Sequence, residues 1–167
     1  GEKPNLANIM EQANLQLAEN NKEHMFVTVF YGILDINTGE FVYVNAGHNP
    51  PLVRHKGEDE FSYIRNEKRN RVIGVSKKSK YQEQYLTLLP GDMLFIYTDG
   101  ITEAMNEQRE LFNENRLKST LDRIEKNCNS NEMLSTVYKA VKQHEGNADQ
   151  SDDITMLGLV YRKGEGV

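Results

Sequence analysis

The sequence predicts an α+β domain, in which antiparallel sheets carry helices packed outside them. A β-branched and aromatic run at 26–35 is followed by a turn at 37–39 and a second run at 41–45, which is typical of a β-hairpin. Residues 93–98 are mostly apolar and too few for a helix, so they predict a central strand. Consecutive strands joined by tight turns favour antiparallel pairing, and helical patterns on either side of them give the α+β class.

The first half of the chain opens with a helix and continues as strands. Apolar residues recur at helical spacing within residues 4–20, namely Leu6, Ile9, Met10, Ala13 and Leu17. Pro50-Pro51 ends the second strand of the hairpin, and the turn at 90–92 leads into the central strand. Shorter strands are expected between these points, at 52–55, 61–64 and 81–88.

The second half returns to helical patterns before a last strand. Two sets of apolar residues each share a helical face: Leu117, Leu121 and Ile124 in the first, and Leu134, Val137, Tyr138 and Val141 in the second. Gly146 is expected to end the second helix. A final strand is expected at 154–161, directly after Asp152 and Asp153.

Length and composition exclude several classes of protein. The 167 residues are enough for one domain with a core, so residues 1–167 are expected to form a single domain. A formal charge of −5 at pH 7 argues against a nucleic-acid partner, and the absence of a long apolar run argues against membrane contact by this segment. Cys128 is the only cysteine, which excludes an intrachain disulfide and fits a reducing, cytoplasmic location.

Carboxylates stand at two junctions between a strand and a loop. Asp99-Gly100 leaves the central strand, and Asp152-Asp153 enters the last one. Hard cations such as Mg²⁺ and Mn²⁺ prefer oxygen ligands held in rigid positions, and a glycine beside a ligand lets another group approach closely. Asp-Gly and Asp-Asp are also common turn and cap dipeptides, so the residues alone leave both interpretations open.

Other candidate side chains carry less information, and none of them is assigned a catalytic role. His48 lies in a Gly- and Pro-rich segment and is interpreted as a turn residue. Glu103 follows Asp99 by four residues, so it faces the same site only if a helical turn begins there. Cys128 is interpreted as structural. A serine hydrolase is poorly supported, because no elbow glycines flank the serines considered, which are Ser79, Ser130 and Ser151.

Four stretches in order carry a resemblance to a known family. They are FVTVFYGILDINTGEFVYVNAGHNPPLV, LTLLPGDMLFIYTDGITEAMNE, ELFNENRL and QSDDITMLGLVYR. Together they resemble the SpoIIE/RsbU-type branch of the PPM (PP2C-like) protein serine/threonine phosphatases, over nearly all of residues 4–162. The resemblance implies a sandwich of two antiparallel β-sheets flanked by helices.

The resemblance also implies an activity and its partners. Members of the family hydrolyse phosphoserine or phosphothreonine on proteins with Mn²⁺ or Mg²⁺. The bacterial branch typically acts on anti-sigma-factor antagonists in partner-switching circuits, often downstream of a sensory module. Carried over to this sequence, Asp99 and Asp152 match metal-binding aspartates, Gly100 matches the close-approach residue, and Asp153 occupies a position with Asn or Asp in relatives. No substrate-binding residue is assigned.

One family motif is not found in this sequence. The first metal motif of the family, G-D-x-x-G-x-G, does not occur, so the chain is expected to be about the C-terminal two-thirds of the domain. Residues 1–167 alone are therefore expected to be inactive, with open sheet edges that favour self-association. Asn113 stands where relatives usually have Gly, and Asn tolerates the left-handed conformation. The alternative is a non-catalytic phosphatase-like module that binds a partner, although the intact DG and DDIT motifs favour the enzyme.

Overall fold

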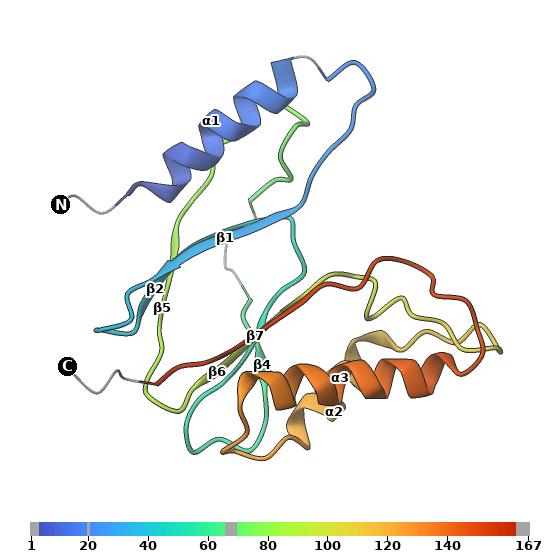
Figure 1. The fold of residues 1–167 in the computed structure, drawn as a ribbon. Coiled ribbons are helices and arrows are strands. Elements are labelled where there is room, and N and C mark those ends of the chain that lie inside the picture. Colours follow the sequence, from blue (N-terminus) through green and yellow to red (C-terminus); the bar gives the residue numbers. More distant parts are fainter. Residues whose placement is uncertain (1–3, 20, 66–69, 163–167) are drawn as a thin grey trace. The chain divides into compact units, whose positions relative to one another are not determined.

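Figure 1 shows the computed structural model of the chain, which describes residues 4–19, 21–65 and 70–162. The polypeptide forms two compact units. The first unit holds the described residues up to His48 and those of Arg65–Leu88, and the second holds Asn49–Ile64 and the residues from Leu89 onward. Each unit is described by itself below, and the expectation of a single domain stays a prediction.

The first unit is a three-stranded antiparallel sheet with one helix. The strand order is β1-β2-β5, with the central strand paired along its length to β1 and at its beginning to β5. The elements are α1 (Leu6–Glu19), β1 (Val29–Leu34), β2 (Glu40–Ala46) and β5 (Gln84–Thr87).

The predicted hairpin turn between β1 and β2 is confirmed, and a carboxylate organises it. One oxygen of Asp35, Oδ1, accepts hydrogen bonds from the main-chain N–H groups of Asn37 (2.8 Å) and Thr38 (3.2 Å). Gly39 closes the turn with φ +77°, a conformation that favours glycine. The turn therefore fixes the register of the first strand pair.

Helix α1 packs on β2 through a narrow apolar face. Leu6 and Met10 are buried against Val44 and Ala46 of the central strand. Asn14 is fully buried on the same helix, where its side chain donates to the carbonyl of Ser76 (2.8 Å) and accepts from the N–H of Gly74 (2.9 Å). This polar contact attaches the loop before β5 to the helix without leaving the buried amide unsatisfied.

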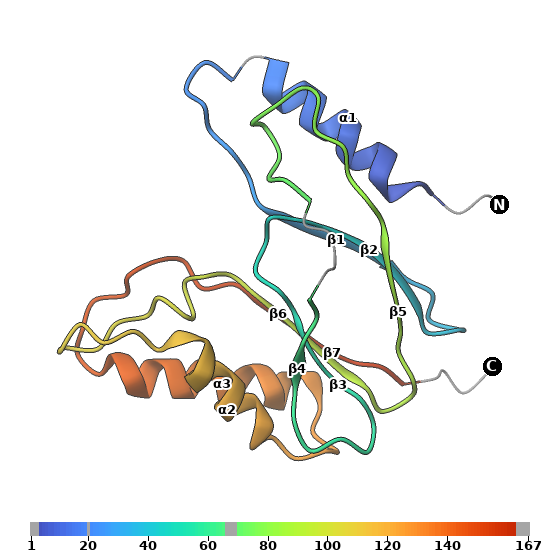
Figure 2. The same ribbon diagram turned by 180° about the vertical axis from the view of Figure 1, so that it is seen from behind.

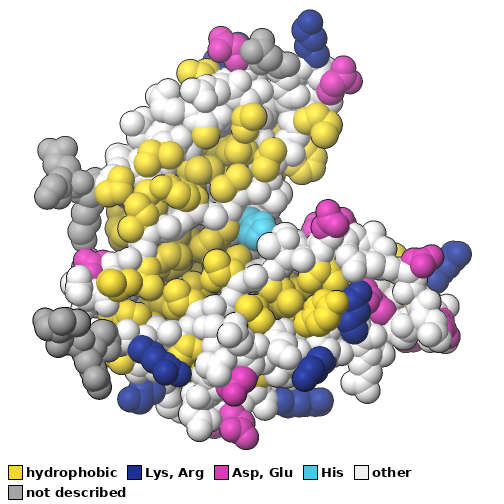
Figure 3. Space-filling model, in the orientation of Figure 1, with side chains coloured by type: hydrophobic (Ala, Val, Ile, Leu, Met, Phe, Trp, Pro, Cys, Tyr) yellow, Lys and Arg dark blue, Asp and Glu magenta, His cyan; other side chains and the backbone are white. Residues whose placement is uncertain are grey.

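Hydrophobic side chains also remain exposed on this unit. Figure 3 shows them gathered over it, and the exposed fraction reaches 60% for Phe26 and 73% for Tyr85. Strand β1 is an outer strand of its sheet, and Ile33 on it is 39% exposed. We expect the predicted self-association to use this exposed apolar surface and the open edge of the sheet.

The second unit is a four-stranded antiparallel sheet with two helices. The strand order is β4-β3-β6-β7, so the apolar segment after the turn at 90–92 is an inner strand, as predicted (Figure 2). The elements are β3 (Leu52–Arg54), β4 (Ser62–Tyr63), β6 (Met93–Tyr97), α2 (Asn113–Asp122), α3 (Ser130–Glu145) and β7 (Met156–Val160).

A single apolar cluster joins the sheet and helices of the second unit. Most of its fully buried side chains come from β3, β6, α2 and α3, and include Leu52, Phe95, Leu117, Leu121, Met133, Val137 and Val141. Helix α3 packs on β7, where a Cβ at Gly158 would lie 3.0 Å from the Met133 methyl group. No helix of the described residues has the length and apolar character that crossing a membrane requires.

The α+β prediction and its two antiparallel sheets are confirmed, and the deviations lie at the ends of elements. The first strand begins at Val29, because Val27 exchanges main-chain hydrogen bonds with Ile73 instead of with β2. Asn113 begins α2 at φ +59°, and Gly146 is the C-cap of α3, so both turn predictions are confirmed.

Candidate functional site

The candidate site begins where β6 and β7 stop pairing as regular strands. The last register pair is Tyr97 with Met156. Beyond it, the N–H of Thr98 donates to the carbonyl of Thr155 (3.1 Å), and the N–H of Thr155 donates to the hydroxyl of Thr98 (3.0 Å). The two acidic segments therefore leave the sheet at the same end of the strands. One follows the last residue of β6, and the other precedes the first residue of β7.

Gly100 lies directly against the main chain of the second acidic segment. A Cβ built on Gly100 would lie 2.3 Å from the carbonyl oxygen of Asp153 and 3.4 Å from that of Asp152. Distances below about 3 Å between such atoms are not found in folded chains, so the position admits only glycine without a shift of the backbone. The predicted close approach at Gly100 thus has a physical partner, which is the main-chain carbonyl group of Asp153.

Asp99 presents its carboxylate to solvent. Its carbonyl oxygen accepts the N–H of Glu103 (2.8 Å) and the hydroxyl of Thr102 (3.2 Å), so the next turn is held by the main chain of Asp99. Among the residues that the structure describes, the Asp99 carboxylate has no hydrogen bond or ion pair. The sequence leaves two roles open for this side chain, capping of the following turn and binding of a cation. No hydrogen bond between the Asp99 carboxylate and the described residues supports the capping role.

Asp152 and Asp153 are both exposed and differ in their local contacts. One carboxylate oxygen of Asp152 accepts the N–H of Asp153 (2.7 Å), which is a local turn contact. The carboxylate of Asp153 has no hydrogen-bonding or ionic partner within the described part of the chain. The carbonyl of Asp153 accepts the hydroxyl of Thr98 (3.2 Å) and so holds this segment against the end of β6.

These contacts bring the two predicted motifs together at one edge of the sheet. The donors there are exposed carboxylates and main-chain carbonyls, which are the hard oxygen ligands that Mg²⁺ and Mn²⁺ take. Within residues 4–19, 21–65 and 70–162, no three His, Cys, Asp or Glu side chains form a group able to hold a metal. The donor chemistry therefore fits a divalent cation, while the ligand set within the described residues is partial.

The other candidate residues take the structural places that the sequence indicates. His48 lies in a turn, where its N–H donates to the side chain of Asn45 (2.8 Å). A helical turn does begin after Asp99, and it brings the N–H of Glu103 to the Asp99 carbonyl. Cys128 is buried, and burial raises the pKa of its thiol, which disfavours the nucleophilic thiolate.

Sequence reasoning missed the part played by Thr98. Its hydroxyl connects the end of β6 to two residues of the other acidic segment, Asp153 and Thr155. The sequence shows only that each motif contains a threonine, Thr98 next to Asp99 and Thr155 two residues after Asp153, and this alone does not indicate a contact between the motifs. A hydroxyl that both donates and accepts is suited to joining two segments that have left the regular ladder.

Comparison with protein families and curated proteins gives a consistent result. The family model of stage II sporulation protein E (SpoIIE) matches residues 1–162. Protein IcfG of Synechocystis sp. is 34% identical over 138 residues, which cover 83% of this chain and 21% of that protein. The phosphoserine phosphatase RsbU of Bacillus subtilis is 26% identical over 152 residues, which cover 90% of this chain and 44% of that protein. The chain thus spans less than half the length of either relative.

Solved structures with the same fold include two from this group. The RsbU and RsbW domains of Rv1364c from Mycobacterium tuberculosis align with a TM-score of 0.73 and 20% identity, covering 96% of this chain and 43% of that one. The PP2C phosphatase domain of SpoIIE from Bacillus subtilis, with a fragment of its regulatory domain, aligns with a TM-score of 0.74 and 16% identity, covering 93% and 44%. The predicted PP2C-like fold is therefore confirmed.

Proposed function

Since this chain belongs to the SpoIIE family, we propose that it is the C-terminal portion of a metal-dependent protein serine/threonine phosphatase domain. The observation that carries the proposal is the contact of Gly100 with the main chain of Asp152 and Asp153, which joins the two acidic motifs at one sheet edge. The similarity to RsbU, which is named a phosphoserine phosphatase, supports hydrolysis of a phosphomonoester on a protein.

The residues proposed to hold Mn²⁺ or Mg²⁺ are Asp99, Gly100, Asp152 and Asp153. The carboxylates of Asp99 and Asp153 are exposed and have no protein partner among the described residues, so no hydrogen bond or ion pair has to break before they bind a cation. Gly100 would contribute its main chain, since glycine has no side chain that could serve as a ligand. The absence of a Cβ also lets the Asp153 main chain lie close to it. The chemistry that bound cations supply is activation of a water molecule and neutralisation of phosphoryl charge.

The proposed centre needs at least one ligand besides these residues. The described residues hold no group of three acidic, histidine or cysteine side chains able to bind a metal. The family resemblance places a further aspartate in a G-D-x-x-G-x-G motif, which this sequence does not contain. We therefore expect residues 1–167 alone to bind Mn²⁺ weakly and to have negligible phosphatase activity.

The proposed substrate is a phosphoprotein in bacterial signalling, such as an anti-sigma-factor antagonist. RsbU is a curated relative, and the Rv1364c structure contains an RsbU domain and an RsbW domain, which supports a place in partner switching. A cytoplasmic location is proposed as well. It is supported by Cys128, a buried free thiol and the only cysteine of the chain.

The test is substitution of Asp99 by Asn in the natural polypeptide that contains residues 1–167. Asn keeps the shape of the side chain and removes its charge, so p-nitrophenyl phosphate hydrolysis with Mn²⁺ should fall by orders of magnitude while the urea unfolding midpoint is retained. Asp149→Asn is the matched control, because Asp149 is also exposed and lies outside the two motifs. Near-normal turnover by a folded Asp99→Asn protein would refute the metal role.

A further inference from the structure

A groove of about 430 Å³ lies between helices α2 and α3 of the second unit. Half-buried Ala140 supplies apolar surface to it, buried Phe112 also lines it, and Arg116, Arg123 and His144 supply polar and charged groups. We call this feature the α2–α3 groove. It shares no lining residue with the proposed metal site, so its chemistry stands apart from catalysis.

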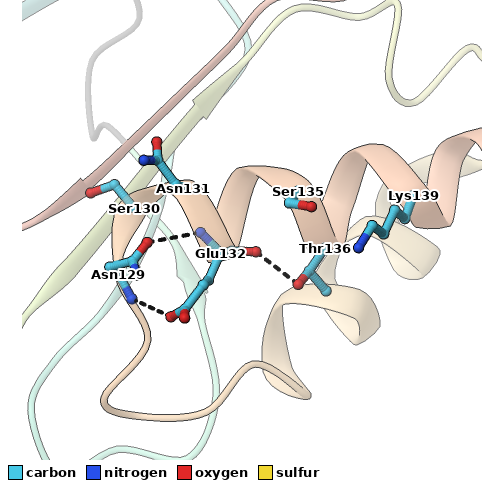
Figure 4. A pocket seen from close by; sticks show the side chains of 7 residues that line it. All are labelled: Asn129, Ser130, Asn131, Glu132, Ser135, Thr136 and Lys139. Carbon is cyan, nitrogen blue, oxygen red and sulfur yellow. Dashed lines mark hydrogen bonds between the residues drawn. The ribbon is translucent and has the colours of Figure 1, made fainter.

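The α2–α3 groove is positive in a chain of net negative charge. Two arginines line it, and no aspartate or glutamate is found among the described residues that do so, although the chain carries a formal charge of −5. The larger hollow along the start of α3 is different (Figure 4). Glu132 and Lys139 both line that one, and the capping box with Asn129 already uses the Glu132 carboxylate.

The guanidinium of Arg116 is held in place at one end of the groove. It donates from Nη1 to Nδ1 of His144 (2.6 Å), and Nε2 of His144 meets the carbonyl of Glu110 (2.9 Å). Since Nδ1 accepts, Nε2 must carry the proton that is donated to Glu110, which assigns the neutral tautomer. One carboxylate already approaches this end, because Oε2 of Glu110 lies 4.0 Å from Nη2 of Arg116.

Arg123 provides a second positive group without an acidic partner. It is exposed, and within the described part of the chain its guanidinium forms no hydrogen bond or ion pair. It follows Arg116 by seven residues, which corresponds to about 10 Å along a helix. An extended peptide covers that distance in about three residues. A guanidinium fork matches a carboxylate in shape and charge, so two such groups suit a linear ligand with several carboxylates.

From these observations we infer that the α2–α3 groove binds an acidic segment of a partner polypeptide. Carboxylates of the segment meet Arg116 and Arg123, and the chain between them lies over the groove at half-buried Ala140. A linear peptide suits the separation of the two arginines better than one compact phosphate, which requires donors that converge on a point. The inference does not depend on the proposed phosphatase activity, because it concerns binding alone.

The test uses a short fluorescein-labelled oligoglutamate as the probe and fluorescence anisotropy as the readout, at low ionic strength. The overall negative charge of the protein repels this probe, so binding reports a local positive site. Arg116→Gln combined with Arg123→Gln should weaken binding about tenfold or more, as expected for loss of charge-assisted hydrogen bonds. Arg123→Gln alone should also weaken it, and this variant removes no contact made within the described residues.

Lys139→Gln is the control, because it removes the same charge from an exposed position of α3 outside the groove. Equal losses in this control and in Arg123→Gln, each of which removes one positive charge, would show diffuse electrostatic attraction and overturn the inference, as would unchanged binding in Arg123→Gln. Glu110→Gln removes the carboxylate that competes at Arg116, so it should tighten binding, and weaker binding would contradict the assignment.

A second arm separates a peptide site from a site for small phosphate anions. Sodium phosphate is compared with sodium chloride at matched ionic strength as a competitor of the labelled oligoglutamate. Equal displacement by the two salts supports a peptide site governed by screening. Displacement by phosphate far beyond that by chloride would identify a compact phosphate site instead, and the inference of an acidic polypeptide would be wrong.

Discussion

The hydroxyl of Thr98 is the side-chain group that joins the two acidic segments of the candidate site. It donates to the carbonyl of Asp153 and accepts the N–H of Thr155, at a point where the regular ladder between β6 and β7 has ended. Without it, these two main-chain groups would have to find water at a half-buried position. This hydroxyl therefore adds two side-chain hydrogen bonds to the main-chain bond between Thr98 and Thr155 that joins the segments.

Replacement of Thr98 by Val should show this contribution directly. Val keeps the branched shape and removes the hydroxyl, so the free energy of unfolding should fall by about 1–2 kcal/mol. Urea denaturation of the two proteins provides the measurement. Thr98→Ser is the control, since it keeps the hydroxyl and should remain closer to the unsubstituted protein; equal losses in both variants would contradict a role for the hydroxyl.

Gly100→Ala tests the close approach of the main chain. The new Cβ would lie 2.3 Å from the Asp153 carbonyl oxygen, so one of the two segments must move, and a loss of about 2–3 kcal/mol is expected. Gly158→Ala is the comparison, because its Cβ would meet the flexible end of the Met133 side chain at 3.0 Å. Chemical denaturation should rank Gly100→Ala as clearly the more damaging change, and the reverse order would refute the steric argument.

At this scale the sequence predicted the residue types and could not predict their partners. Asp99 as a candidate metal ligand and Gly100 as a position of close approach were both predicted from the YTDG motif. The group that Gly100 contacts lies more than fifty positions further along the chain, and only the register of β6 with β7 decides that it is Asp153. Thr98 was missed for the same reason, since a threonine at a strand end has no distinctive local pattern.

Among the elements, the segment that follows α2 is held by a buried arginine of β3. Arg54 is 3% exposed and donates to the carbonyls of Ile124 (2.8 Å) and Glu125 (3.1 Å), just beyond the last helical residue. Its guanidinium also lies 4.9 Å from the centre of the Phe61 ring. These two carbonyls belong to the segment that follows the helix, so a strand of the sheet holds that segment in place.

Arg54→Met should therefore weaken the second unit. Met has a similar length and leaves two carbonyls without their charged donor, so the free energy of unfolding should fall by about 2–3 kcal/mol. Thermal or urea unfolding followed by circular dichroism provides the measurement. Arg54→Lys is the comparison, because it keeps a positive donor and should recover part of the loss. A Met variant as stable as the unsubstituted protein would show that these carbonyls are satisfied in another way.

The elements themselves were predicted well wherever apolar periodicity is local. Helix α1, strand β1 and the inner strand β6 lie within the predicted ranges, α3 contains the predicted apolar face and ends before Gly146, and β2 extends one residue beyond each end of its predicted range. The errors concern strand ends. Residues 26–28 read as part of the first strand, yet Val27 pairs with Ile73 of a loop. Amino-acid composition cannot show whether Val27 pairs with β2 or with the loop at Ile73, because both segments offer the same main-chain donors and acceptors.

For the whole chain, the sharpest prediction concerns metal binding by residues 1–167. Two acidic motifs remain together, while the described residues form no group of three metal-binding side chains. Calorimetric titration with Mn²⁺ should therefore show weak binding, and a parallel assay with p-nitrophenyl phosphate should show negligible turnover. Tight stoichiometric binding with robust turnover would mean that the site is complete within these residues. Addition of EDTA to any active preparation provides the metal-removal control.

The order in which the two units use the chain has a consequence for how the protein folds as it is synthesised. The polypeptide passes from the first unit to the second after His48, returns at Arg65 and leaves again after Leu88. Strand β3 thus emerges early, but its partner β6 follows only after all of β5 has been made. The first sheet can form as soon as β5 is made, while β3 and β4 are looped out. The second sheet must wait for β7, and its formation therefore carries the entropic cost of closing a long loop. The nascent chain therefore completes its units in sequence, and no single proteolytic cut separates one from the other.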